Sequence, residues 1–185
     1  MADNKKTYTP MDITSFWLGL EEKQYWQKDD AFDAELTAKF GNVLKEARSG
    51  DLDHWCDDQH GVLALTLILD QFNRNILRGT PQMFDTDEHA RTVANYAMRT
   101  DMIERFDERE RRWFIMPFMH SEDFRNQRFC VAMCKRYGLK NNLPHAIEHR
   151  DIIKEFGRFP HRNKILGRES TPQEIEFLNN GGFAG

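Results

Sequence analysis

Apolar residues recur with a helical period along nearly the whole chain, and this pattern limits the possible folds more than any other feature. Six residues between positions 32 and 47 show it, spaced as on one helix face: Phe32, Leu36, Phe40, Val43, Leu44 and Ala47. Gly50 follows where a C-cap is expected. No segment alternates polar and apolar residues for long enough to predict a strand. The sequence therefore predicts an all-α fold, with antiparallel helix pairs packed around one core.

Caps and prolines indicate where several helices begin and end. We expect helices over about 61–76, 87–99, 121–137 and 144–157. Serine is a preferred N-cap residue, so Ser121 is expected to cap the helix over 121–137. Pro117 should end the helix that precedes Ser121. Thr171, Pro172 and Glu174 predict a capping box for a last helix.

Composition bounds the class of protein. The chain has 185 residues, of which 39% are hydrophobic and 30% are charged, and these values fit one globular domain over residues 1–185. We expect the two ends, about 1–8 and 180–185, to be mobile. A net charge of −4 argues against nucleic-acid binding by bulk charge. The longest apolar run, 62–69, is too short to span a membrane, and the N-terminus lacks an apolar signal core. These features favour a cytoplasmic protein without a membrane or nucleic-acid partner.

Neither the cysteines nor the histidines predict a metal site. Cys130 and Cys134 are four residues apart, a spacing that suits neither a redox CxxC motif nor a zinc finger, and we expect small buried thiols. "HAIEH", from His145 to His149, matches the pattern of one class of zinc protease. Both histidines share a helical face with apolar residues, so a structural role is favoured. We therefore predict no metal and no cofactor.

A first polar cluster lies at the end of the apolar helix expected over 61–76. At 100° per residue, five polar side chains form one contiguous arc: Asp70, Gln71, Arg74, Asn75 and Arg78. Asp70 and Arg74 can pair at i, i+4. Two interpretations stay open, because paired charges can either clamp helices together inside the protein or form the floor of a polar pocket.

A second cluster surrounds His120. The turn before a helix start offers free N–H groups and can receive an anion, and His120 and Glu122 could act as an acid/base pair. A helix cap explains Ser121 and Glu122 without any ligand, but it does not explain His120.

The third cluster is the segment "FGRFPHRNKILGR", residues 156–168, which contains four cations, one histidine and no acid. We expect its phenylalanines to anchor it in the core and its polar residues to gather around a short helical turn: Arg158, His161, Arg162 and Arg168. Guanidinium groups suit phosphate or carboxylate, but pairing with acids elsewhere in the chain is an equal alternative.

Four segments carry a resemblance to a known family: "FWLG", "LDQFNRNILRGT", "MPFMHSED" and "HRDIIKEFGRFPHRNKILGRESTPQE". In this order, between Ser15 and Leu178, they resemble a bacterial uncharacterised family, domain-of-unknown-function family 924. The resemblance implies a single all-α domain with a tetratricopeptide-like arrangement of helix pairs. It implies no activity and no catalytic residues, and the "HAIEH" spacing is not part of the pattern.

Two functional hypotheses follow. In the first, the three clusters line one cleft that binds, or acts on, a small anionic molecule. Its candidate catalytic residues are His120, Glu122 and His161, and its candidate ligand-binding residues are Asp70, Gln71, Arg74, Arg78, Arg158, Arg162 and Arg168. In the second, the protein is a helical interaction module that receives a peptide in a groove, and the polar clusters only lock its helices. No serine or cysteine nucleophile stands beside a base, so anion binding is placed ahead of any named reaction. The sequence decides neither whether the protein is an enzyme nor its oligomeric state.

Overall fold

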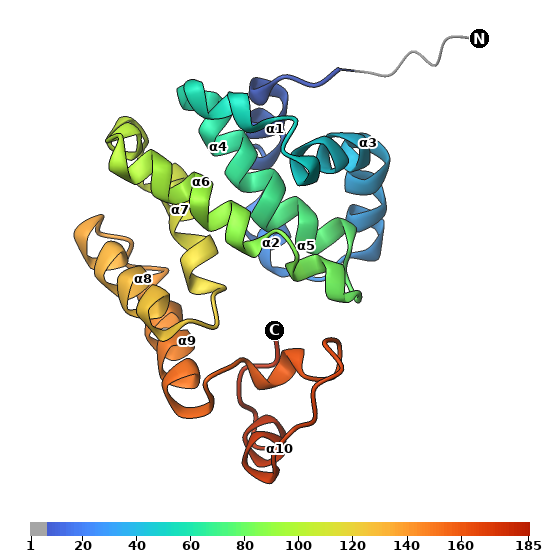
Figure 1. Ribbon diagram of the computed structural model, residues 1–185, viewed down its shortest axis with the longest axis vertical. Coiled ribbons are helices and arrows are strands. Elements are labelled where there is room, and N and C mark those ends of the chain that lie inside the picture. The colour runs from blue at the N-terminus through green and yellow to red at the C-terminus, as the bar shows by residue number, and fades with distance from the viewer. Residues whose placement is uncertain (1–6) are drawn as a thin grey trace.

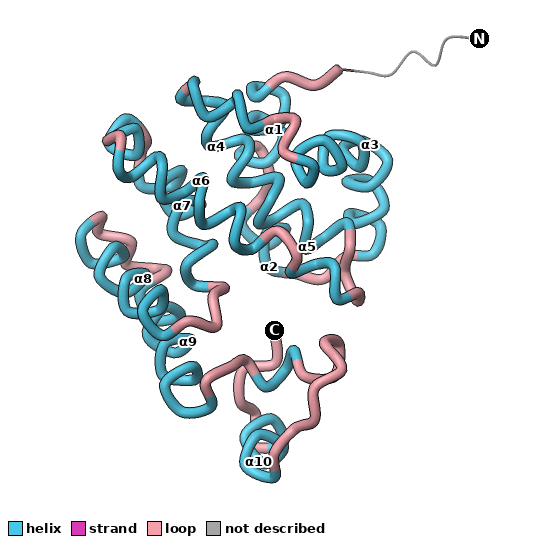
Figure 2. The backbone as a smooth tube through the Cα atoms, in the orientation of Figure 1, coloured by secondary structure: helices cyan, strands magenta, loops and turns pink. Residues whose placement is uncertain are grey.

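The structure, a computed structural model, describes residues 7–185 as helices and loops, without a strand among those residues (Figure 2). The α-helices are α1 (Pro10–Leu18), α2 (Glu22–Trp26), α3 (Asp30–Ser49), α4 (Gln59–Leu67), α5 (Asn73–Ile76), α6 (Asp87–Arg99), α7 (Glu108–Met119), α8 (Phe124–Arg136), α9 (Leu143–Phe156) and α10 (Pro172–Asn179). The predicted all-α single domain is confirmed.

Helices that follow one another in the chain pack on one another. Contacts join α6 to α7, α7 to α8 and α8 to α9, while the apolar α4 contacts α1, α6 and α7. In Figure 1, α8 and α9 extend away from the N-terminal helices, and the segment after α9 carries α10 and then brings the C-terminus back toward the centre. The tetratricopeptide-like arrangement implied by the resemblance stays a prediction.

The apolar helix α4 occupies the centre because it is buried all round, from Gly61 to Leu67. Gly61 permits a close approach, since a Cβ atom there would lie 2.1 Å from the carbonyl oxygen of Trp55. A π-helical turn, Ile68–Phe72, continues α4 directly into α5. The regular helix predicted over 61–76 is therefore one continuous helix with a wider turn at its middle.

Several helix ends lie where the sequence places them. Gly50 ends α3 with φ of 85°, and Gly157 ends α9 with φ of 70°. Both angles lie in the left-handed region that glycine adopts without a steric penalty. Thr171 and Glu174 form the predicted capping box of α10.

The prediction for the turn around His120 was wrong in two respects. Helix α7 continues through Pro117 to Met119, because a proline one turn before a helix end removes only a single hydrogen bond. Helix α8 starts at Phe124, not Ser121, and Asp123 caps it by accepting the Arg125 N–H at 2.7 Å. The Ser121 hydroxyl instead accepts a hydrogen bond from Asn126 at 2.9 Å. His120 is consequently the C-cap of α7.

The predicted mobile ends are packed where the structure describes them. Residues 1–6 lie outside the described residues, but Tyr8 packs on Phe40 with ring centroids 4.8 Å apart. Near the other end, Phe183 packs on His149 at 4.4 Å. Mobility itself stays a prediction. Within residues 7–185, no helix combines the length and apolarity needed to cross a membrane.

Candidate functional site

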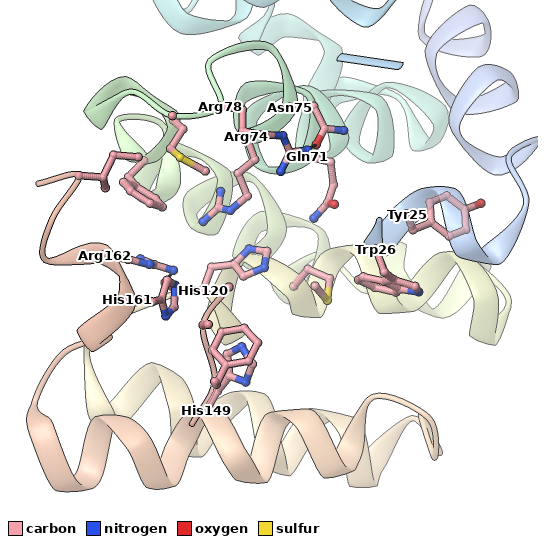
Figure 3. Close-up of a pocket in the computed structure, with 18 of the residues that line it drawn as sticks. Tyr25, Trp26, Gln71, Arg74, Asn75, Arg78, His120, His149, His161 and Arg162 are labelled. Atoms are coloured by element: carbon pink, nitrogen blue, oxygen red, sulfur yellow. Dashed lines mark hydrogen bonds between the residues drawn. The ribbon is translucent and has the colours of Figure 1, made fainter. Parts of the chain in front are cut away.

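The three polar clusters predicted from the sequence meet at one cavity of about 390 Å³, called the cleft below (Figure 3). Most of its polar lining comes from the long helix, the end of α7, α9 and the loop after α9: Gln71, Arg74, Asn75, Arg78, His120, His149, His161 and Arg162. Gln27, at the end of α2, also lines it. The π-helical turn at Ile68–Phe72 contains Asp70 and Gln71, so the wider turn positions the first polar residues of the site.

Asp70 lies beneath the cleft and is 1% exposed. Its Oδ1 is 2.8 Å from His120 Nδ1 and 3.2 Å from Arg74 Nη1, while its Oδ2 accepts a hydrogen bond from Gln71 Nε2 at 2.6 Å. The predicted Asp70–Arg74 pair is therefore present. Because Arg74 and Gln71 also line the cavity, the clamp and the pocket floor are the same group of residues.

Burial raises the pKa of the Asp70 carboxyl, but the positive charges of His120 and Arg74 and two hydrogen bonds together lower it to about 2. The Asp70 carboxylate consequently stays ionised at neutral pH although solvent hardly reaches it.

Two carboxylates that the sequence analysis did not assign to the site compensate the arginines. Asp87, the first residue of α6, is 2.8 Å from Arg74 Nη1 and 3.8 Å from Arg162 Nη1. Asp33 of α3 pairs with Arg78. Its position at the start of α6 gives no sequence signal that Asp87 faces a distant loop.

Arg162 is 7% exposed and its charge is only partly compensated. Its guanidinium lies over the rings of Phe84 and Phe159, at 4.6 and 4.5 Å from their centroids. Nη2 donates to the carbonyl oxygen of His120 at 2.9 Å, but Nε has no hydrogen-bond partner and Nη1 is beyond hydrogen-bond distance of Asp87. Burial and the nearby charge of Arg74 lower the pKa of Arg162 to about 10.

Three histidines border the cleft. His120 Nδ1 faces Asp70, and His149 Nδ1 faces the carbonyl oxygen of His145 at 2.8 Å. Each acceptor requires a proton on Nδ1, so the neutral ring keeps a lone pair on Nε2. His161 Nδ1 is buried without a hydrogen-bond partner.

Burial disfavours the charged form of all three rings. It lowers the pKa of His149 to about 3, with the charge of His120 adding to the effect. Burial and the charge of Arg162 lower the pKa of His161 to about 4. For His120, burial and the charge of Arg74 outweigh the attraction of Asp70, so its pKa is lowered as well. The histidines are neutral at pH 7 and can act as proton acceptors.

Three other residues predicted for the site form internal salt bridges and do not line the cleft. Arg158 pairs with Glu174, which is 2% exposed, at 2.6 Å. Arg168 donates two hydrogen bonds to Glu122, at 2.7 and 2.9 Å, and Glu122 also accepts the N–H of Phe159 at 2.8 Å. Glu122 thus fixes the loop to the His120 turn, and its oxygens already accept three hydrogen bonds.

The described residues contain no group of three or more histidine, cysteine, aspartate or glutamate side chains placed to hold a metal ion. The two histidines of "HAIEH" lie in different surroundings, since the His145 side chain is 67% exposed and His149 is buried. Cys130 and Cys134 are buried free thiols.

Aromatic and sulfur-containing residues also line the cleft, and the sequence did not predict them: Tyr25, Trp26, Met83, Phe84, Met116 and Phe183. They come from segments far apart in the chain. Helical periodicity indicates that a residue such as Met116 or Phe84 is buried, but it does not indicate which distant segment the residue faces. The sequence therefore contains no signal that these residues line the cleft.

A model of a family described as "Bacterial protein of unknown function (DUF924)" matches residues 13–182. A solved structure of a protein of unknown function from Agrobacterium tumefaciens is 41% identical to this chain, with a TM-score of 0.89 over 93% of this chain and 97% of that one. No curated protein matches. The family match covers most of the chain, and the chain belongs to the bacterial family of unknown function DUF924.

Proposed function

We propose that the cleft binds a small anionic molecule through a phosphate or carboxylate group. The observation that carries the proposal is Arg162, a buried arginine with incomplete charge compensation at the cavity wall. A buried charge costs several kcal/mol unless it is paired. An anion beside Nη1 would supply the missing partner.

The other cationic groups of the cleft support this assignment to Arg162. Arg74 is paired with Asp70 and Asp87, and Arg78 with Asp33. An anionic ligand would therefore gain the most binding free energy at Arg162, where a guanidinium fork suits a phosphate or carboxylate. The neighbouring Arg74 would add a longer-range attraction.

The His120–Asp70 pair would allow the site to move a proton as well as to bind. A carboxylate that accepts the Nδ1 proton leaves Nε2 free as a general base toward the cleft. His120 is the group most suited to this role, because the carboxylate of Glu122 is occupied by Arg168 and Phe159. We propose acid/base chemistry by His120 as the reaction class, should the ligand be turned over.

Thermal unfolding tests the binding. At pH 7, millimolar phosphate or sulfate should raise the melting temperature more than chloride at equal ionic strength, because binding to the folded state stabilises it. Arg162→Ala should abolish the difference while helical content is unchanged by circular dichroism. Arg158→Ala is the matched control, since that arginine lies outside the cleft, and it should keep the difference.

An equal response to phosphate and chloride in the parent protein would contradict the proposal. It would favour the second hypothesis, a helical interaction module whose polar clusters serve only as clamps.

A further inference from the structure

A second cavity of about 530 Å³ lies beside the cleft, and we call it the apolar compartment. Six residues border both cavities: Trp26, Met116, His120, His149, Phe183 and Gly185. Two cavities that share a wall of this extent can receive two parts of one molecule.

The compartment takes its apolar walls from α2, α7 and the segment after α10. Met116 and Met119 stand three residues apart on α7, so they lie on the same side of the helix. Trp26, 51% exposed, forms the rim and stacks on Trp113 at 6.1 Å. Flexible thioethers beside aromatic rings are suited to an apolar body of variable shape.

Arg112, the one lysine or arginine among the described residues that line the compartment, is already paired with a carboxylate. Arg112 makes two hydrogen bonds to the carboxylate of Glu22, at 2.8 and 3.2 Å, and lies over the Trp113 ring at 4.6 Å. An anion placed here would have to compete with Glu22. The two cavities therefore differ in the charge that they can accept. The anionic group of a ligand fits at Arg162, and an uncharged body fits between Trp26 and Met119.

We propose that the ligand of the cleft is an organic anion with an apolar body of about the size of a ring, bound across both cavities. This inference rests on the proposed function, because the anionic group is placed at Arg162. In Figure 3, Arg162 and Trp26 lie on opposite sides of His120, so such a ligand passes the His120 ring. Each cavity alone lies in the volume range of ordinary small-molecule sites.

Calorimetric titration of the full chain with inorganic phosphate and with phenyl phosphate tests the inference. Burial of the ring should make phenyl phosphate bind at least about tenfold more tightly than phosphate. Met119→Gln should reduce this ratio to less than about threefold and leave the phosphate affinity unchanged, because Met119 borders only the apolar compartment. Trp26→Ala, at the border of both cavities, should also reduce the ratio to less than about threefold. Met11→Gln, an exposed methionine on α1, is the matched control and should retain the parent ratio.

The outcomes separate the two proposals. If phosphate binds and phenyl phosphate binds no more tightly, the inference is overturned while the anion site stands. A ring advantage that persists in both variants also overturns it, because the ring would then bind elsewhere. If neither compound binds, the proposed function fails and the inference fails with it. Circular dichroism of each variant establishes folding, and Trp26→Ala decides the matter if Met119→Gln does not fold.

Discussion

Nδ1 of His120 lies 2.8 Å from Oδ1 of Asp70, joining the end of α7 to the π-helical turn across fifty residues of sequence. The contact joins two helices, and it also fixes which ring nitrogen of neutral His120 carries the proton. Stability and site geometry consequently depend on the same carboxylate. A substitution at Asp70 should disturb both.

Replacing Asp70 by alanine should lower the free energy of unfolding by about 3–5 kcal/mol, because Arg74 would stay buried with one of its two carboxylates removed. Urea unfolding of the variant and the parent measures the difference. Glu35→Ala is the control, since it breaks an exposed i, i+4 pair with Lys39 and should cost less than about 1 kcal/mol. If Asp70→Ala is as stable as the parent, the clamp does not stabilise the fold.

Stability should fall as the pH drops from about 6.5 toward 4. The pKa of His149 is about 3 in the folded protein against an ordinary value of 6.5, so in this range the unfolded chain binds a proton that the folded chain does not. Each such histidine contributes a slope of about 1.4 kcal/mol per pH unit. Asp70 adds little above about pH 5, because its lowered pKa affects stability only as the pH approaches and falls below its ordinary value of 3.8.

Unfolding free energies measured at several pH values test this slope. His149→Phe keeps a ring against Phe159 and Phe183 and should flatten the slope between pH 6 and 4.5. His145→Gln, four residues away with an exposed side chain, should leave it unchanged. Equal slopes in the parent and in His149→Phe would contradict the expectation.

Arg158 should matter for stability and not for anion binding. It donates to Glu174 and to the carbonyl oxygen of Glu169, tying the loop after α9 to the start of α10. These hydrogen bonds help lower the pKa of Glu174 to about 2. Glu174→Ala should therefore destabilise the protein more than Arg158→Ala, because it removes one acceptor each from Arg158, Asn163 and the Thr171 N–H. Urea unfolding gives the order, and greater loss in Arg158→Ala would refute it.

Helical periodicity, caps and glycines are local signals, and they predicted the helices from α3 onward but not α1 or α2. The sequence also predicted that the three clusters meet. It also identified Asp70, His120 and Arg162, because charge beside buried residues requires partners. It could not divide the arginines of residues 158–168 between site and scaffold. That division depends on which acid lies opposite each one, and Glu174 and Glu122 are brought there by tertiary packing.

The helix ends around Pro117 illustrate a second limit. Local rules predicted a break at the proline and a start at Ser121, yet α7 reaches Met119 and Asp123 caps α8. Burial of Met116, Phe118 and Met119 favours the longer helix over the lost hydrogen bond. The two-residue shift changes His120 from a helix start into a C-cap, which turns its side chain toward Asp70.

Removing the Phe183 ring should raise the pKa of His149. The ring packs on His149 at 4.4 Å and on His161 at 5.1 Å, and it borders both cavities. Burial is the main cause of the low pKa of His149, so Phe183→Ala, which admits water to the ring, should move that pKa upward from about 3. Titration of the imidazole nitrogens by NMR measures it. Phe177→Ala is the matched control, because the ring of Phe177 packs on Phe156 in the same region, whereas His149 packs on Phe159 and Phe183. An unchanged pKa in Phe183→Ala would mean that the remaining walls of the cleft, rather than this ring, keep His149 dry.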